Sequence, residues 1–227
     1  MPYNWLLFDA DNTLWDFSSA EASALELTLR NRDIDWSDEV LGQYRQINHR
    51  AWRDYEDGLL PKEQLRTIRF QRLLEHYRAD HPAEELSFDY RTYLSESTHM
   101  LDGAVDLLED LQGKYRLALI TNGLTEVQRP RLANTGLEKY FEFVVISDEI
   151  GVAKPHAPFF DYAYARMEQA DKSSVLVIGD NANADVGGAL SYGFDACWLR
   201  HPGAADRKGL GETHRIRDIR ELRNIVL

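Results

Sequence analysis

Five short apolar runs constrain the fold of this chain more than any other feature of its sequence. They are residues 5–8, 117–120, 143–146, 175–178 and 196–199, and they are rich in leucine, aromatic and β-branched side chains. Continuous apolar runs of this length are typical of strands that are buried on both faces, as in a parallel sheet. Segments with helical spacing precede the second and fourth runs. This alternation predicts a doubly wound α/β fold with a parallel sheet.

The stretch between the first and second runs breaks this rhythm. It has helical patterns and no convincing strand, with helices expected at residues 20–29, 40–55, 62–77 and 88–99. We therefore expect an α/β catalytic core made of residues 1–14 and 98–227, and an inserted α-helical bundle cap made of residues 15–97. An insertion after the first strand lies over the carboxyl ends of the strands, where open α/β sheets bind their ligands.

Two carboxylates follow the first run directly. Asp9 and Asp11 lie at the mouth of a buried strand, where like charges repel and burial raises the cost of ionising either group. Such a pair suits a metal ion, a nucleophile with its acid/base partner, or both. A capping or turn pair is the structural alternative when the two aspartates are considered alone.

Polar residues also follow the later strands. Thr121 and Asn122 come after the second run, Lys154 comes a short way after the third, and Asp180 and Asp185 come after the fourth. In a parallel sheet these positions converge on the edge that holds the first pair of aspartates. Several carboxylates in one place need a cation, and hard oxygen ligands of this kind favour Mg²⁺. A lysine beside them offers a point charge for a phosphate oxygen.

The order of these residues resembles the haloacid dehalogenase-like hydrolase superfamily over the whole chain. The segment Asp9-x-Asp11-x-Thr13 is similar to its first motif, Thr121 to the second, Lys154 to the third, and Asp180 with Asp185 to the fourth. The inserted helices are similar to the cap of the helical-cap subclass, so the resemblance implies a Rossmann-like core beneath them. The haloacid dehalogenases themselves lack an aspartate two residues after the nucleophile, so Asp11 favours phosphoryl chemistry.

The resemblance implies that the chain hydrolyses phosphomonoesters through a covalent intermediate. Asp9 would be the nucleophile that forms an aspartyl-phosphate. Asp11 would protonate the leaving oxygen and later activate the water that hydrolyses this intermediate. Mg²⁺ would be held by the Asp9 carboxylate, the Asp11 main-chain carbonyl and Asp180, and would offset the repulsion between Asp9 and the phosphate.

The remaining motif residues would bind or orient groups around the phosphate. Thr121 and Lys154 would bind the phosphoryl oxygens as charge shifts among them in the transition state. Asn122 would help to complete this oxygen cradle. Asp185 would orient Lys154 or a metal-bound water in place of coordinating the ion directly.

The expected cap carries a finer resemblance. Residues 48–58, followed by residues 69–70, are similar to the cap of bacterial pyrimidine 5′-nucleotidases, which are phosphatases for nucleoside monophosphates. Four aromatic residues could form a flat apolar surface for a base: Trp15, Phe17, Trp52 and Tyr55. Among them, Trp52 and Tyr55 are the candidate substrate-binding residues. Stacking a base on an aromatic ring contributes about 1–3 kcal/mol. Trp52 and Tyr55 at helical spacing are also typical of a bundle core.

These observations favour a Mg²⁺-dependent phosphatase for small phosphomonoesters. Nucleoside 5′-monophosphates with pyrimidine bases are the expected substrates. A sugar phosphatase or a phosphosugar mutase of the same fold is the alternative within the enzymes. A haloacid dehalogenase or a non-catalytic binding module fits less well, because a pure binder has little use for a nucleophile together with its acid.

Charge and cysteine usage limit the partners. The 26 basic and 38 acidic residues give a formal net charge of -12, which disfavours polymeric nucleic acid and anionic membranes. The single cysteine, Cys197, cannot form an internal disulfide, so a reducing compartment is expected. With no signal-peptide pattern at the start of the sequence, we expect a cytoplasmic protein, either a monomer or a small homo-oligomer.

Overall fold

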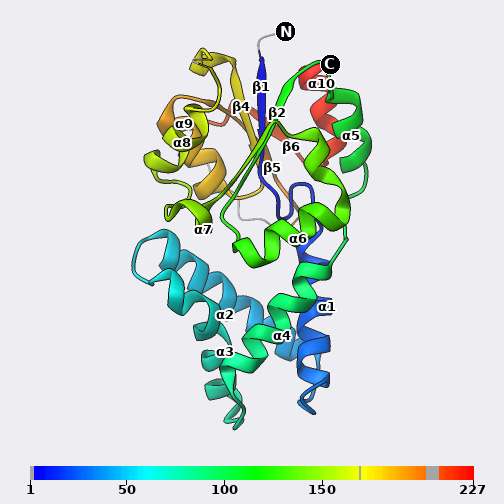
Figure 1. The fold of residues 1–227 in the computed structure, drawn as a ribbon, viewed down its shortest axis with the longest axis vertical. Coiled ribbons are helices and arrows are strands. Elements are labelled where there is room, and N and C mark those ends of the chain that lie inside the picture. The colour runs from blue at the N-terminus through cyan, green and yellow to red at the C-terminus, as the bar shows by residue number, and fades with distance from the viewer. Residues whose placement is uncertain (1–2, 169, 203–209) are drawn as a thin grey trace.

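A six-stranded parallel sheet forms the centre of the upper half of the molecule (Figure 1). The computed structural model describes residues 3–168, 170–202 and 210–227. The sheet order is β3-β2-β1-β4-β5-β6, with strands β1 (Trp5–Phe8), β2 (Arg116–Thr121), β3 (Phe143–Ile146), β4 (Val175–Gly179), β5 (Asp195–Leu199) and β6 (His214–Ile216). The five predicted runs are confirmed as β1 to β5. Strand β6 escapes sequence reasoning because only Ile216 in it is buried.

Helices cover both faces of the sheet, as the doubly wound prediction requires. Alternate residues of β1 point to opposite faces, so Leu6 and Phe8 pack on one side and Trp5 and Leu7 on the other. The first side is covered by α5 (Ala104–Leu111), α6 (Thr125–Thr135) and α10 (Arg223–Val226), and the second by α8 (Ala157–Tyr164) and α9 (Gly188–Tyr192). Shorter turns are α7 (Ser147–Ile150), a π-helical turn (Ala182–Gly187) and 3-10 turns at Leu137–Tyr140, Lys172–Ser174 and Ile219–Leu222.

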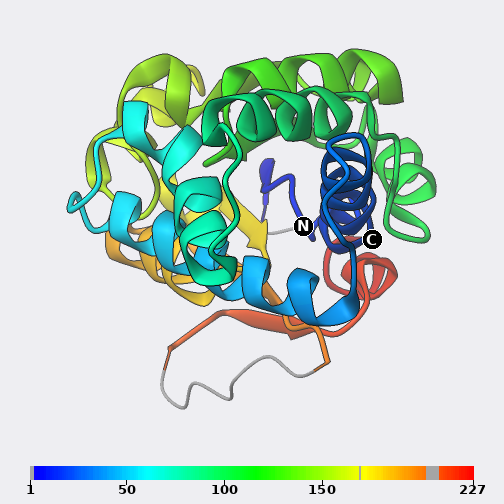
Figure 2. The same ribbon diagram turned by 90° about the horizontal axis from the view of Figure 1, so that it is seen from below.

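Four long helices form the lower half of the molecule (Figures 1 and 2). They are α1 (Phe17–Arg30), α2 (Asp38–Glu56), α3 (Lys62–Tyr77) and α4 (Ala83–Glu96). Side-chain caps start two of them, since Asp16 accepts a hydrogen bond from Ser19 N and Ser37 accepts one from Val40 N. The helices share a hydrophobic core of their own, and they bury Leu124 and Val127 from the α6 region within it. Among the described residues, no helix combines the length and apolar character needed to cross a membrane.

Two helices differ from the sequence expectations. Helix α4 begins at Ala83, five residues before the predicted start at Phe88, and it ends at Glu96. Pro82 precedes it and two acidic residues occupy its first turn, which are both signals of a helix start. Helix α6 was not predicted, because Pro130 lies inside it and its apolar residues form no clear stripe.

A buried polar network holds the four-helix group together. The Asn48 side chain donates to Glu21 Oε1 at 2.9 Å and accepts from Arg69 Nη1 at 3.0 Å. The Arg69 guanidinium carbon also lies 5.5 Å from the centre of the Tyr90 ring. Buried polar groups stabilise a fold only when they are paired. Asn48 and Arg69 belong to residues 48–58 and 69–70, which resemble the pyrimidine 5′-nucleotidase cap. Both therefore have a structural role inside the helical group.

The strand order places a ligand site at one edge of the sheet. Strand β1 pairs with β2 on one side and with β4 on the other. The chain moves outward from β1 through β2 to β3, then crosses back and continues outward through β4, β5 and β6. In open α/β sheets, ligands bind at the carboxyl ends of the strands where this direction reverses. That point lies between β1 and β4, above the four-helix group.

Candidate active site

A cavity of about 410 Å³ lies at this reversal point. Its upper wall is formed by residues that follow β1, β2 and β4, and its lower wall by side chains of α1 and α2. The side chains that line it include Asp9, Asp11, Phe17, His49, Trp52, Glu56, Thr121, Asn122, Lys154, Asp180 and Asp185. All of the core residues predicted from the strand ends therefore meet in one cavity.

Asp9 is the buried centre of the cavity. Its amide donates to Ile178 O at 2.8 Å, which continues the pairing of β1 with β4 beyond the end of the strand. Its Oδ1 accepts from Lys154 Nζ at 2.7 Å, and its Oδ2 accepts from Thr13 Oγ1 at 3.2 Å. Burial raises the pKa of Asp9 to about 7, Lys154 opposes this shift, and Asp185 adds to it. The protein thus holds a carboxyl group where ionisation is costly without further positive charge.

Lys154 provides positive charge inside the cavity and is only 1% exposed. Its Nζ donates to Asp9 Oδ1, to Asp185 Oδ1 at 2.6 Å and to Ile120 O at 2.8 Å. Burial alone would lower the pKa of Lys154, but Asp185 and Asp9 together raise it. Because an ammonium group has three hydrogens, all of its donors are already used. A phosphate oxygen can reach Lys154 only by sharing one of these bonds.

Side chains of Asp185 and Asn181 hold the loop after β4 in place through hydrogen bonds to its main chain. Asp185 Oδ2 accepts from Asn181 N at 2.9 Å, so both Asp185 oxygens are engaged. Asn181 Oδ1 in turn accepts from the amides of Asn183 and Ala184 and caps the π-helical turn. This geometry fits the expected role of Asp185 in orienting Lys154. It also gives Asn181 a capping role that sequence reasoning did not identify.

The donor set fits a divalent cation. Carboxylate oxygens of Asp9, Asp180 and Asp185 all lie within 4.8 Å of one another. Burial, followed by the charges of Asp9 and Asp185, raises the pKa of Asp180 well above its usual value. A cation beside these oxygens would favour their ionised forms. Carboxylate ligands of this type suit Mg²⁺.

Asp11 is held by two residues of α6. Its Oδ1 accepts from Arg131 Nη1 at 2.6 Å, and its Oδ2 accepts from Gln128 Nε2 at 2.9 Å. Sequence reasoning identified neither partner. A signal was available, because residues three apart on a helix lie on one face and this helix directly follows the Thr121 motif.

Asn122 fastens the loop that carries Lys154. Its side chain accepts from Lys154 N at 2.8 Å and donates to Lys154 O at 2.8 Å. Its Nδ2 also donates to Glu56 Oε1 at 3.1 Å, which joins the sheet edge to α2. These contacts orient the Lys154 loop, and a direct contact of Asn122 with substrate stays a prediction.

The helical wall of the cavity contains some of the predicted aromatic residues. Phe17 and Trp52 line the cavity, whereas Trp15 and Tyr55 do not. Trp15 is fully buried beneath α6, and Tyr55 contacts the Trp52 ring edge to face at 5.9 Å between ring centres. The role of Tyr55 in substrate binding therefore stays a prediction.

His49 and Glu56 also line the cavity and were not among the predicted site residues. Together with Trp52 they follow the spacing i, i+3, i+7, so one face of α2 points toward the site. That spacing is the sequence signal that could have identified them. Burial raises the pKa of Glu56, Asn122 opposes this shift, and Asp185 adds to it.

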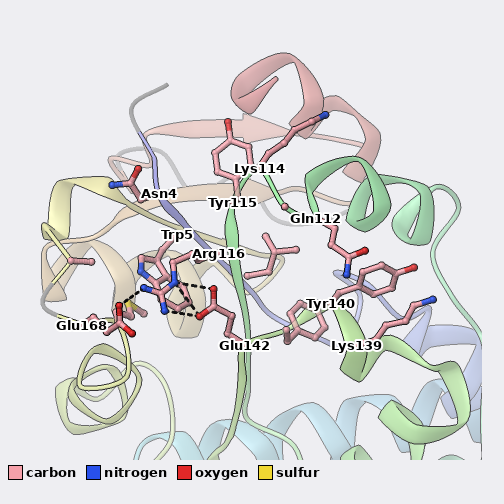
Figure 3. A pocket seen from close by; sticks show the side chains of 15 residues that line it. Asn4, Trp5, Gln112, Lys114, Tyr115, Arg116, Lys139, Tyr140, Glu142 and Glu168 are labelled. Atoms are coloured by element: carbon pink, nitrogen blue, oxygen red, sulfur yellow. Dashed lines mark hydrogen bonds and ion pairs between the residues drawn. The ribbon is translucent and has the colours of Figure 1, made fainter.

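A second hollow of about 740 Å³ lies at the opposite end of the sheet, where strands β1 and β2 begin (Figure 3). Its central cation, Arg116, donates to Glu142 and Glu168 and lies 4.3 Å from the centre of the Trp5 ring. The charge of Arg116 is thus already balanced by the protein. None of the motif residues lines this hollow, so the chemistry is concentrated at the other edge.

Gly179 is required for the close approach of Asp185. A Cβ at position 179 would lie 2.2 Å from Asp185 Oδ2 and 2.3 Å from its Cγ. We predict that Gly179→Ala lowers the free energy of unfolding by about 1–3 kcal/mol, as overpacking of a buried site does. Urea denaturation measures the change. The control is Gly42→Ala in α2, where a Cβ meets nothing within 4 Å and stability should rise by about 0.5–1 kcal/mol. An unchanged stability of Gly179→Ala would contradict this packing argument.

Known proteins resemble this chain in sequence and in fold. A family model described as haloacid dehalogenase-like hydrolase matches residues 3–193. The chain is 34% identical over 224 residues to the HAD-hydrolase YfnB of Bacillus subtilis (strain 168), covering 99% of this chain and 95% of that protein. It is 33% identical over 226 residues to the pyrimidine 5'-nucleotidase YjjG of Escherichia coli (strain K12), covering 100% of this chain and 99% of that protein.

The solved structures agree with the sequence comparison. A crystal structure of YfnB from Bacillus subtilis bound to magnesium matches with a TM-score of 0.94 and 34% identity, covering 100% of this chain and 99% of that chain. The L-2-haloacid dehalogenase from Xanthobacter autotrophicus matches with a TM-score of 0.77 at 19% identity, over 99% of this chain and 98% of that chain. That second likeness shows a shared fold. With the sequence match and the fold in agreement, the chain belongs to the haloacid dehalogenase-like hydrolase family.

Proposed function

We propose that this protein is a Mg²⁺-dependent phosphatase that hydrolyses nucleoside 5′-monophosphates, with pyrimidine bases preferred. The observation that carries the proposal is the setting of Asp9, a buried carboxylate 2.7 Å from Lys154 Nζ, with Asp11 lining the same cavity. A nucleophile and a separate acid/base group at one point are what two-step phosphoryl transfer needs. The name of YjjG, a pyrimidine 5'-nucleotidase, supports the substrate class.

The metal site would use the clustered carboxylates. The Asp9 carboxylate, the Asp11 main-chain carbonyl and Asp180 would hold Mg²⁺, and the magnesium-bound structure of YfnB supports this choice of ion. When bound, the ion supplies positive charge that reduces the repulsion between a carboxylate nucleophile and a phosphate dianion. Asp185 would stay outside the coordination shell, where its two oxygens hold Lys154 Nζ and Asn181 N.

In the first step, a carboxylate oxygen of Asp9 attacks phosphorus in line with the leaving group. The new oxygen–phosphorus bond forms as the ester bond to the nucleoside oxygen breaks, and Asp11 gives that oxygen its proton. Thr121 donates its hydroxyl hydrogen to a phosphoryl oxygen. Lys154 shares with the phosphoryl group the hydrogen bond that it makes to Asp9.

In the second step, Asp11 acts as a base. Having lost its proton, it takes one from a water molecule that attacks phosphorus. The bond between phosphorus and Asp9 breaks, which releases inorganic phosphate and restores the Asp9 carboxylate. Lys154 and Asp185 keep the restored carboxylate in its original position.

Residues 15–97 would act as a mobile cap on a core made of residues 1–14 and 98–227. The two parts meet at an apolar contact, where Leu124 and Val127 pack into the helical core, and at polar contacts, such as Lys62 Nζ with Asp148 O at 2.8 Å and Arg66 Nε with Glu126 Oε1 at 2.6 Å. The Arg66–Glu126 ion pair is partly exposed, and ion pairs of this kind contribute little stability, so this contact can break and re-form. The YfnB structure is described as revealing interdomain movement, which supports a cap of this type. Closure would exclude bulk water from the phosphate.

The cavity walls favour a leaving group without further negative charge. Phe17 and Trp52 offer aromatic surface for a base, while the Glu56 carboxyl faces the same space. Lys154 is the only Lys or Arg among the described lining residues, and its hydrogen bonds are already used. A second phosphate would share the cavity with the carboxyl groups of Glu56 and Asp11, and like-charge contacts of this kind cost several kcal/mol.

We predict that Asp9→Asn abolishes turnover and leaves folding intact. An amide keeps the shape of the side chain but cannot form the acyl phosphate. Phosphate release measures turnover, and thermal unfolding followed by circular dichroism reports folding. The control is Asp106→Asn on the exposed face of α5, which should retain full activity. Normal turnover by Asp9→Asn, with mass spectrometry excluding deamidation, would rule out the nucleophile.

We predict that Mg²⁺ raises the melting temperature more at about pH 7.5 than at about pH 5. The raised pKa values of Asp9 and Asp180 mean that the metal-free folded state binds more protons than the unfolded state. Its stability therefore falls as the pH rises from about 4 to about 7, and at low pH protons compete with the ion. At about 100 times its Kd the ion contributes about 2.7 kcal/mol. Asp180→Asn should remove the shift, and an equal shift in that variant would contradict the proposed ligand.

We predict a substrate order in a phosphate-release screen. Uridine 5′-monophosphate should have a kcat/KM roughly 5- to 150-fold above that of ribose 5-phosphate, because a stacked base contributes about 1–3 kcal/mol. It should also exceed uridine 5′-diphosphate, whose extra charge meets Glu56. Adenosine 5′-monophosphate tests the base preference.

Matched variants separate the two sources of this selectivity. Trp52→Ala should reduce the advantage over ribose 5-phosphate, and Glu56→Gln should reduce the advantage over the diphosphate. Equal rates with ribose 5-phosphate in the unmodified enzyme would favour the sugar phosphatase alternative. An isomer in place of inorganic phosphate would indicate a mutase.

A further inference from the structure

Two side chains of α6 enclose the proposed proton-transfer residue. Arg131 and Gln128 hydrogen-bond the two different oxygens of Asp11 at 2.6 Å and 2.9 Å. Arg131 Nη1 also lies 3.3 Å from Gln128 Oε1, so the three side chains form one connected group. Arg131 and Gln128 are almost fully buried, while the Asp11 side chain is 29% exposed toward the cavity. Helix α6 thus holds Asp11 on the buried side and leaves the side that faces the cavity open.

Arg131 is a poor choice for stability alone. It is fully buried, and its Nε and Nη2 atoms have no hydrogen-bond partner among the described residues. Its guanidinium carbon lies 4.2 Å from the centre of the Trp15 ring, which offsets part of the cost of burial. Buried donors without partners are destabilising. The contact with Asp11 is the strong interaction that this position gains.

Gln128 connects Asp11 to the phosphate-binding hydroxyl. Its Nε2 donates to Asp11 Oδ2 and to Thr121 Oγ1, both at 2.9 Å. Thr121 Oγ1 also accepts from Gly123 N at 3.2 Å. With two donors on its oxygen, the Thr121 hydroxyl keeps its own hydrogen for another acceptor. Gln128 therefore fixes the orientation of both groups.

Gly123 provides the space in which Gln128 lies. A Cβ at position 123 would lie 2.4 Å from Gln128 Cγ and 2.4 Å from Nε2. Such a distance requires the glutamine side chain to move. The absence of a side chain at Gly123 therefore leaves the space that Gln128 occupies. A substitution at Gly123 is thus an independent way to displace Gln128.

We propose that Gln128 and Arg131 are positioning residues for proton transfer. They hold Asp11 where it can reach the leaving-group oxygen, and Gln128 also orients Thr121. This inference rests on the proposed role of Asp11 as the acid, and it extends that role to a helix outside the sequence motifs. The proton passes from Asp11 to the leaving oxygen, and neither α6 residue gains or loses one.

The leaving group provides a readout specific to this role. The alkoxide of a nucleoside needs a proton as it departs, whereas p-nitrophenolate is stable enough to leave without one. The value of kcat/KM covers the steps up to departure of the leaving group. A misplaced acid therefore lowers kcat/KM for uridine 5′-monophosphate much more than for p-nitrophenyl phosphate, whereas general structural damage lowers both alike.

The experiment compares both substrates in Gln128→Met and Arg131→Met. Positioned acids contribute roughly 10²–10⁴-fold, so in Arg131→Met we expect kcat/KM for uridine 5′-monophosphate to fall at least about tenfold and for p-nitrophenyl phosphate less than about threefold. Gln128→Met also releases Thr121, so it should lower the value for p-nitrophenyl phosphate as well, but by a smaller factor than the value for uridine 5′-monophosphate. Asp11→Asn sets the upper limit of this difference. The matched control is Arg129→Met, on the same helix, because Arg129 is exposed and pairs with Glu149. It should leave both values unchanged.

Two further variants keep the test decisive. Gly123→Ala should reproduce the substrate-dependent loss of Gln128→Met, and Arg131→Lys should lose less than Arg131→Met because it keeps the charge. If Gln128→Met fails to fold, as thermal unfolding would reveal, Gly123→Ala and Arg131→Met carry the test. Equal losses on both substrates in the folded variants would overturn the positioning role. If the unmodified enzyme hydrolyses neither ester, or Asp11→Asn shows no substrate dependence, the proposed function itself fails.

Discussion

The ammonium group of Lys154 allows the carboxylates of the sheet edge to lie close together. It is buried, and its three hydrogens contact Asp9, Asp185 and the main chain of β2. Removing such a group would leave two buried carboxylates without a cationic partner, which costs several kcal/mol. The surrounding contacts serve this arrangement, since Asn122 clamps the Lys154 backbone and Gly179 makes room for Asp185.

The meeting of residues so far apart in sequence follows from parallel pairing. Four strands end in polar residues, and a parallel sheet places those ends at one edge. For this reason the sequence alone was sufficient to predict the sheet from its apolar runs, and to predict that Asp9, Thr121, Lys154 and Asp180 share a cavity. The short strand β6 was missed because its pairing with β5 relies on the backbone and on one buried isoleucine.

The residues that sequence reasoning missed depend on side-chain direction. An aromatic residue is flat wherever it occurs, but only the packing of the helices decides that Trp52 faces the cavity while Trp15 lies beneath Arg131. Gln128 was missed for a related reason. Its helix has no clear apolar stripe and contains a proline, so neither the helix nor the direction of its side chains was visible in the sequence.

The inserted helices leave and rejoin the α/β part at neighbouring points. Trp15 forms an isolated bridge with Met100, and Asp16 N donates to His99 O at 3.1 Å. The two ends of the 84-residue segment between Trp15 and Met100 therefore lie side by side at the α/β part. Under the proposed function, substrate choice and bond-breaking chemistry would lie in separate segments of the chain, with Gln128 and Arg131 in the segment that carries the bond-breaking residues.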